Sequence, residues 1–170
     1  MSIIYNTRLT AIPADQLGKP AANNPIIVDQ ANLTLYEFTL NTDIMSYKFP
    51  TPIDYKDGDI SFYVVWTNDG GVDDQNKFAK WQLDYQVGTE GDVIDGSHGN
   101  SPKSVEDEYL SASGWVEHHT EYMTIEAADF TGKTCIYLKL SAVTPAGTAL
   151  TCSPHLLGIC FLYNLAINKV

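Results

Sequence analysis

Two alternating segments separated by a loop of seven residues constrain the fold of this chain more than any other feature. In the first, 60–69, four large apolar side chains share one face: Ile60, Phe62, Val64 and Trp66. In the second, 77–88, a second apolar set shares one face: Ala79, Trp81, Leu83, Tyr85 and Val87. A period of two is typical of β-strands with one face on a core. Because Gly70 and Gly71 allow the chain to reverse, we expect an antiparallel hairpin with Trp66 and Trp81 buried.

Further apolar or alternating segments predict more strands, and helical periodicity is almost absent. The expected strands cover residues 3–9, 26–28, 32–40, 44–49, 115–126, 135–143 and 156–167. The last of these is nearly all apolar, which indicates a strand buried on both faces. Residues 88–114 are rich in Gly, Ser, Asp and Glu and predict a long loop. The fold class is therefore all-β, and we expect a jelly-roll-type antiparallel β-sandwich with about eight strands, with a closed barrel as the alternative.

The N-terminal segment differs in composition from the remainder. Residues 11–25 contain three prolines and an Asn–Asn pair, which favour an irregular, extended path. We expect residues 1–25 to form an extended N-terminal arm and 26–170 to form the jelly-roll domain. The arm is either a mobile tail or a segment that orders against a neighbouring subunit. Ile3, Ile4 and Tyr5 are apolar for a free tail and are candidate contact residues.

Charge and cysteine content restrict the partners and the compartment. The formal net charge of −11 disfavours nucleic acid and anionic membranes, because both are bound through clustered Lys and Arg. No apolar run reaches the length of a membrane helix, and the first residues lack the pattern of a signal peptide. The odd number of cysteines, three, requires at least one thiol outside an intrachain disulfide. We expect three reduced thiols and synthesis in a cytoplasm.

No motif predicts catalysis, a metal or a cofactor. His119 and Glu121 would share a strand face and could hold zinc with a distant third ligand, whereas His118 would point the other way; polar side chains on a half-exposed strand are the better explanation. The acidic run 69–74 lacks the EF-hand spacing and is better explained as a hairpin loop. A second acidic cluster, Glu90, Asp92 and Asp95, shows no catalytic spacing. We therefore expect no enzyme, no metal site and no cofactor.

Several segments in order resemble a known family. A strand that ends in a proline-flanked segment, 47–52, is followed by DYKDGD, by ISFYVVW, by KWQLDYQV and finally by PHLLGICFLY. This order resembles the jelly-roll structural proteins of tailed bacteriophages, which include head decoration or cement proteins and modules of fibres and tails. The resemblance covers most of residues 40–167 and rests on packing patterns. It implies an oligomer, often a trimer, and it carries over no catalytic residues.

Two functions follow as expectations. The first is a virion structural protein on the capsid surface, made in the host cytoplasm, that stabilises the phage head by binding the major capsid protein as a homo-oligomer, expected to be a trimer. Its candidate contact residues are Ile3, Ile4, Tyr5 and Tyr109. The second is a carbohydrate- or receptor-binding module of a fibre or tail, whose rings would stack on sugar faces. Its candidate residues are Tyr55, Tyr109 and Trp115.

Overall fold

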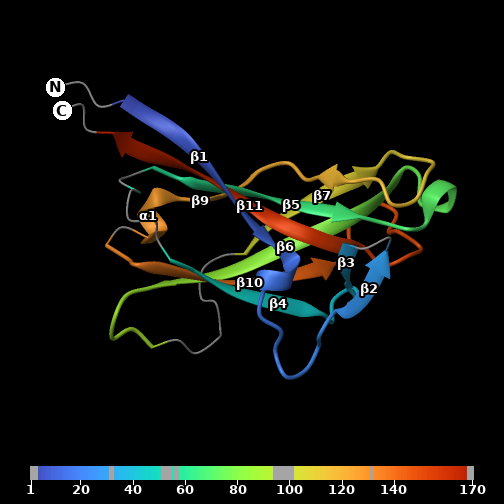
Figure 1. Ribbon diagram of the computed structural model, residues 1–170, viewed down its shortest axis with the longest axis horizontal. Helices are drawn as coiled ribbons and strands as arrows, with labels where there is room; N and C mark the ends of the chain where they lie inside the picture. Colours follow the sequence, from blue (N-terminus) through green and yellow to red (C-terminus); the bar gives the residue numbers. More distant parts are fainter. Residues whose placement is uncertain are drawn as a thin grey trace.

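The computed structural model describes residues 4–30, 33–50, 55, 58–93, 102–130 and 132–167. In these residues, eleven strands form two antiparallel sheets that pack face to face, so the predicted all-β sandwich is confirmed (Figure 1). The seven-stranded sheet contains β1 (Ile4–Pro13), β2 (Ile26–Gln30), β3 (Leu33–Glu37), β5 (Ile60–Thr67), β8 (His118–His119), β9 (Met123–Ile125) and β11 (His155–Ile167). The four-stranded sheet contains β4 (Ile44–Pro50), β6 (Lys77–Gly88), β7 (Lys103–Tyr109) and β10 (Cys135–Val143).

Helical structure is minor in the part of the chain that the structure describes. Two 3-10 turns, η1 (Ala14–Gln16) and η2 (Gly71–Asp73), and one short helix, α1 (Ala127–Phe130), lie between the strands. No helix in the described ranges is long and apolar enough to cross a membrane.

The apolar faces predicted for β5 and β6 are correct, but the predicted hairpin is wrong. Ile60, Phe62, Val64 and Trp66 are fully buried, as is Trp81 of β6. However, β5 pairs with β11, β8 and β9, whereas β6 pairs with β10 and β7 in the other sheet. The two strands contribute to one core from opposite sheets. Alternation identifies the face that meets the core, and it does not identify the neighbouring strand.

The region 88–126 also differs from the prediction. The expected loop 88–114 contains β7, a mostly charged strand that pairs with β6 along seven residues. The expected strand 115–126 contains only the two short strands β8 and β9, which pair with β5. An edge strand exposes one side to water and therefore needs few apolar residues, and this explains why apolar periodicity did not reveal β7.

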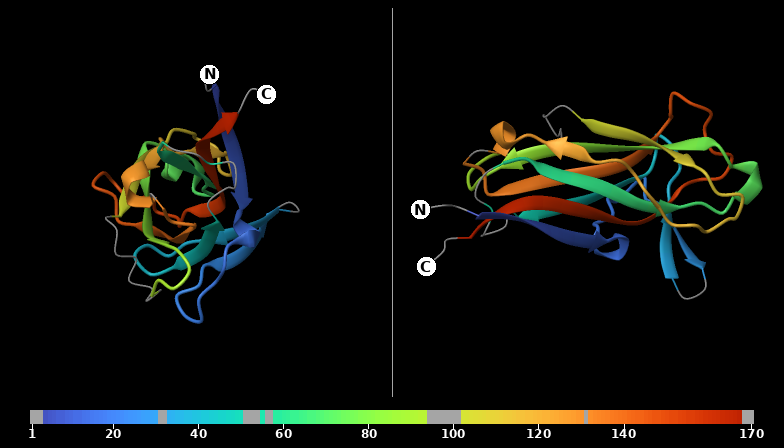
Figure 2. Two further views of the ribbon diagram at one scale, coloured as in Figure 1. Left: turned by 90° about the vertical axis from the view of Figure 1, so that its left-hand side faces the viewer. Right: turned by 90° about the horizontal axis from the view of Figure 1, so that it is seen from above.

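The N-terminal segment belongs to the sandwich, which differs from the expected boundary at residue 25. Strand β1 pairs with β11 over ten residues, from Ile4 opposite Ile167 to Pro13 opposite Gly158. Ile12, Ala14 and Leu17 lie in the hydrophobic core. The ends of β1 and β11 consequently lie side by side at one end of the molecule (Figures 1 and 2). Residues 1–3, including Ile3, lie outside the described residues.

Candidate functional site

The outward face of the seven-stranded sheet is largely uncharged. Strand register places its outward side chains in three rows that cross β1, β11 and β5. The rows are Leu9, Leu162 and Ser61; Ala11, Cys160 and Tyr63; and Pro13, Gly158 and Val65. The next strands add Thr124 beside Ser61 and His119 beside Val65. None of these residues is Lys, Arg, Asp or Glu, which is unusual for a sheet face that meets water.

The outward face of the four-stranded sheet has the opposite character. Lys80 of β6 forms an ion pair of 3.2 Å with Glu106 of β7. Lys139 of β10 forms one of 2.7 Å with Asp84 of β6. Charged cross-strand pairs of this kind are typical of a solvated face. The two sheets thus share one core but differ in what they present outward.

Apolar side chains extend along the outward face of the seven-stranded sheet from Leu9 on β1 to Leu33 on the β2–β3 hairpin. We call Leu9, Ala11, Pro13, Leu33, Val65 and Leu157 the apolar surface. The exposed fractions of Leu9 and Leu33 are 55% and 59%. Four of these residues, Ala11, Pro13, Val65 and Leu157, line a shallow hollow of about 190 Å³. The β2–β3 hairpin projects from the body beside this surface (Figure 2) and exposes Ile26 and Ile27 as well.

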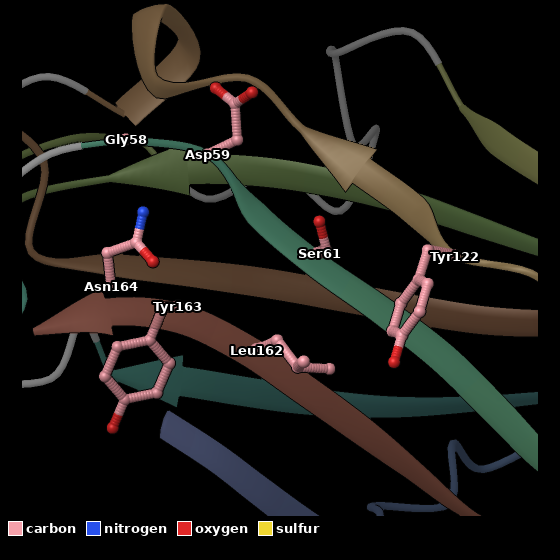
Figure 3. A pocket seen from close by; sticks show the side chains of 7 residues that line it. All are labelled: Gly58, Asp59, Ser61, Tyr122, Leu162, Tyr163 and Asn164. Carbon is pink, nitrogen blue, oxygen red and sulfur yellow. The ribbon is translucent and has the colours of Figure 1, made fainter. Parts of the chain in front are cut away.

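A groove with mixed chemistry lies on the same face, toward β9. It has a volume of about 580 Å³ and is lined by Gly58, Asp59, Ser61, Tyr122, Leu162, Tyr163 and Asn164. Figure 3 shows Leu162 between the ring of Tyr122 on one side and Asn164 on the other. The Asp59 carboxylate accepts a hydrogen bond of 2.9 Å from the backbone N–H of Ala127. The groove therefore combines carboxylate, hydroxyl and amide groups with an aromatic ring.

Tyr122, which lines the groove, belongs to a group of three contacting rings. The ring of Tyr63 stacks on His119 at 5.3 Å and meets Tyr122 edge-on at 5.4 Å between centroids. A hydrogen bond with the Cys160 thiol, assisted by burial, raises the pKa of Tyr63 to about 12. His119 Nε2 lies 2.8 Å from Glu117 Oε1. These contacts fix the orientation of the rings and leave Tyr122 57% exposed.

The sequence-predicted contact residues lie elsewhere, and one of them is inaccessible. Tyr109 is fully buried, and its hydroxyl donates a hydrogen bond to the Ser113 carbonyl (2.6 Å), with the Asn68 carbonyl as a second acceptor at 3.2 Å. It can contact neither a sugar nor a capsid, so that prediction is wrong. Its place in an acidic segment suggested a loop, whereas it ends β7 with its ring against Trp66.

The remaining predicted residues are not gathered in one site. Tyr55 is half-buried, packs against the core and donates a hydrogen bond to the Gly58 carbonyl. Trp115 is half-buried, with φ of +65° and its ring 5.0 Å from His155. It lines a small pocket with Leu33 and Leu157, next to the apolar surface. Ile4 and Tyr5 lie in β1, opposite Ile167 and Ala166.

Hydrogen-bond donors of the protein itself hold the acidic loop that follows β5. Asp74 is fully buried, and its carboxylate accepts hydrogen bonds from the backbone N–H groups of Thr151 (2.6 Å) and Cys152 (3.1 Å) and from the Thr151 hydroxyl. Burial raises the pKa of Asp74, but these hydrogen bonds outweigh it and hold the pKa below its usual value. In the described residues, no three His, Cys, Asp or Glu side chains are placed to hold a metal ion.

The side chain of His118 points away from that of His119. It is half-buried between the rings of Trp66 and Tyr109, at 5.1 and 4.6 Å. Burial lowers the pKa of His118. The two neighbouring histidines thus point to different surroundings, as the strand geometry predicted.

Comparisons with known proteins identify the fold class. No family model and no curated protein matches this sequence. Among solved structures, the chain is similar to CBM35 from Cellvibrio japonicus Abf62, with a TM-score of 0.50, 13% identity and coverage of 96% of this chain and 100% of that one. It is also similar to part of the Bacillus thuringiensis Cry4Aa toxin, with a TM-score of 0.54 and 10% identity.

A third similar structure is an exo-β-1,3-galactanase from Phanerochaete chrysosporium, with a TM-score of 0.52 and 8% identity. The matches cover 95% and 92% of this chain but only 24% of the toxin chain and 29% of the galactanase chain. At these identities the likeness concerns the fold alone. The chain is an antiparallel, jelly-roll-like β-sandwich, of a kind that also occurs as a module within longer proteins.

Sequence reasoning missed the residues of the groove, although a signal for them existed. The residues between the buried ones in β5 are Ser61, Tyr63 and Val65, and none of them is charged. Strand β11 was predicted to be buried on both faces, yet its outward residues Leu157 and Leu162 are only half-buried. Together these patterns indicated that the outward face of this sheet contacts a partner or a ligand. The residues that form the patterns lie on the outward face of the seven-stranded sheet.

Proposed function

We propose that this chain is a structural protein of a phage virion, which decorates the head shell as an oligomer. The observation that carries the proposal is the contrast between the two outward sheet faces. One carries cross-strand ion pairs, whereas the three central rows of the other contain no charged residue and supply part of the apolar surface. Strands that are apolar on both faces are typical of sheets covered on both sides. An apolar face of this kind favours a partner.

A second copy of the chain is the partner that fits this surface. Each copy carries a formal charge of −11, so two copies repel one another except where the contact is free of charge. The six residues of the apolar surface supply such a contact. Symmetric oligomers use the same surface on each subunit or adjacent patches of one surface, and a self-complementary apolar face suits either arrangement.

The size of the surface indicates which elements the contact includes. Three strands about 4.8 Å apart, with three outward rows about 7 Å apart, cover only about 300 Å². A stable interface buries about 800 Å² on each partner. The projecting β2–β3 hairpin, with Ile26, Ile27 and Leu33 exposed by 59%, 54% and 59%, supplies further apolar area beside the face. We therefore expect the hairpin to lie in the same contact.

Such an oligomer decorates a head shell by binding alone, and no catalysis is needed. An oligomer that spans several shell subunits gains by multivalency, because each contact after the first is intramolecular. The resemblance of residues 40–167 to phage jelly-roll proteins supports this setting. The major capsid protein is the proposed partner, and the ion-paired face and the loops provide the polar surface left for it.

Light scattering after size exclusion tests the self-association. The native chain is expected to be an oligomer, and Leu157→Glu is expected to be a monomer because it places a charge within the apolar surface. Leu9→Glu repeats the test on β1. Val93→Glu is the matched control, since Val93 is 79% exposed in the loop after β6 and lies outside the surface. A monomeric native chain at high concentration, or an unchanged Leu157→Glu oligomer, contradicts the proposal.

Co-sedimentation with undecorated, expanded heads of the phage that encodes the chain tests the decoration role. The native protein is expected to sediment with the heads, and Leu157→Glu is expected to reach a much lower occupancy because it loses multivalency. Val93→Glu again serves as the control. Failure of an oligomeric native protein to bind the heads would exclude the decoration role and leave the self-association intact.

A further inference from the structure

The groove between β5, β11 and the segment before β9 has the chemistry of a carbohydrate site. We propose that it binds a neutral oligosaccharide of two or more sugar units, with Tyr122 as the central platform. At about 580 Å³ the groove falls within the usual range for ligand sites, about 300–1,000 Å³. Its lining residues come from β5, β11 and the segments before β5 and β9 (Figure 3).

The ring of Tyr122 is exposed and held in place. It is 57% exposed, and Tyr63 packs against it with an interplanar angle of 88°. Tyr63 is itself fixed by His119 on one side and by its hydrogen bond with Cys160 on the other. A ring that is already ordered loses little conformational entropy on binding. The C–H face of a pyranose packs on such a ring through apolar contact and weak C–H interactions.

The opposite side of the groove offers planar polar groups. Asp59 and Asn164 carry two polar atoms each on a flat group, so each is able to contact two neighbouring sugar hydroxyls. Asp59 is oriented by its hydrogen bond from Ala127, and Ser61 by a contact of 3.3 Å with Thr124. Gly58 has φ of +95°, and a Cβ there would lie 3.3 Å from Asn164 Nδ2. The absence of a side chain at Gly58 therefore leaves space for the side-chain amide of Asn164.

A second pocket that shares Tyr122 with the groove sets the length of the ligand. It has a volume of about 240 Å³ and is lined by Tyr63, His119, Thr120, Glu121 and Tyr122. Because Tyr122 lines both hollows, a chain of sugars that crosses its ring reaches both. We infer one sugar unit in the smaller pocket and at least one in the groove.

The charges around the site select the class of sugar. Asp59 lines the groove and Glu121 lines the second pocket, while the residues lining either hollow include no Lys or Arg. The formal charge of the whole chain, −11, adds to this field. Carboxylated or sulfated sugars are therefore repelled, and neutral sugars are favoured.

An array of immobilised oligosaccharides tests the inference. It holds neutral gluco-, galacto-, manno- and xylo-oligosaccharides of one to six units, together with sialylated and sulfated ones. The native protein is expected to bind neutral members of two or more units. Tyr122→Ala is expected to weaken this binding about tenfold or more, which corresponds to about 1.4 kcal/mol. Asn164→Ala tests the polar side, and Tyr137→Ala, on the outward face of the other sheet, is the matched control.

The outcomes are independent of the proposed role on the capsid, since no capsid is present. Absence of neutral-sugar binding, preference for sulfated or sialylated sugars, or equal loss in Tyr122→Ala and Tyr137→Ala would each overturn the inference. Thermal melts of each variant show whether it has folded. Sugar binding by Leu157→Glu at a per-chain affinity close to native would show that the site works without the oligomer contact.

Discussion

The carboxylate of Asp74 lies 2.6 Å from the backbone nitrogen of Thr151, although 77 residues separate them in the chain. The Thr151 hydroxyl and the Cys152 N–H also donate to this carboxylate, and Lys77 approaches to 3.4 Å. Asp74 thus joins the loop between β5 and β6 to the loop before β11. This junction holds the connection that carries the chain from one sheet to the other.

Replacing this carboxylate is expected to destabilise the fold. Asp74→Asn leaves buried N–H groups facing an amide that is itself partly a donor, and we expect a loss of about 2–3 kcal/mol in the free energy of unfolding. Asp73→Asn is the control, because Asp73 is exposed in the same loop. Urea denaturation at pH 7 measures both. Equal effects of the two substitutions would mean that the Asp74 hydrogen bonds do not stabilise the junction.

The same group predicts a pH dependence. Because the pKa of Asp74 is lowered in the folded state, its contribution to stability is present above the unfolded pKa of about 3.9 and is lost as pH falls through the folded value. The difference in stability between the native chain and Asp74→Asn is therefore expected to be full at pH 7 and to shrink below about pH 4. Denaturation at pH 7, 5, 4 and 3 checks this. A difference that grows on acidification contradicts it.

The two core tryptophans are expected to respond differently to the same substitution. Trp66 Nε1 donates a hydrogen bond of 2.8 Å to Asp107, whereas Trp81 Nε1 is buried without a hydrogen-bond partner among the described residues. Trp66→Phe leaves the half-buried Asp107 with one donor fewer, so we expect it to cost about 1–2 kcal/mol more than Trp81→Phe. Each variant is compared by urea denaturation. The full truncation Trp81→Ala is expected to cost about 3–5 kcal/mol.

Much of the fold was accessible from the sequence because the core imposes a period of two on its strands. The inward faces of β5 and β6 were predicted residue by residue, and all the inward residues of β5 are fully buried. Strand pairing was not accessible, since both strands present the same pattern whether they are neighbours or face one another across the core. β7 was missed because its residues are mostly charged and pair on one side with Lys80.

The candidate site was less predictable for a physical reason. Exposed aromatic residues were sought in loops, but Tyr63 lies on the outward side of β5, where a ring and a core residue give the same sequence signal, and Tyr122 lies directly before β9. Tyr109 and Tyr122 both occur in polar segments, yet Tyr109 at the end of β7 is buried and Tyr122 just before β9 is exposed. The side chain of Asn164, on β11, lies next to Gly58, although more than a hundred positions separate the two residues in the chain.

The three cysteines are free in the structure and are expected to react in a set order. Cys135 and Cys160 are buried, and Cys152 is half-buried. Burial, assisted by the nearby charge of Asp69, raises the pKa of Cys152, so little thiolate forms at neutral pH. We expect Cys152 to be labelled first by a thiol reagent, more slowly than a free cysteine, and the other two only on unfolding. Mass spectrometry without reductant that finds a loss of two hydrogens would instead indicate a disulfide.

Strand β1 is expected to stabilise the sandwich, which distinguishes it from a detachable arm. Ile12 is 3% exposed in the core, whereas Gln16, four residues later, is exposed. Ile12→Ala removes buried apolar volume and is expected to cost about 2–4 kcal/mol, while Gln16→Ala is expected to be nearly neutral. Deletion of residues 2–13 uncovers the edge of β11 and is expected to lower the melting temperature by several degrees or to prevent folding. Urea denaturation and thermal melts measure these effects. If the deletion and Ile12→Ala both leave stability unchanged, the segment does not belong to the sheet in solution and the pairing of Ile12 with Ile159 is incorrect.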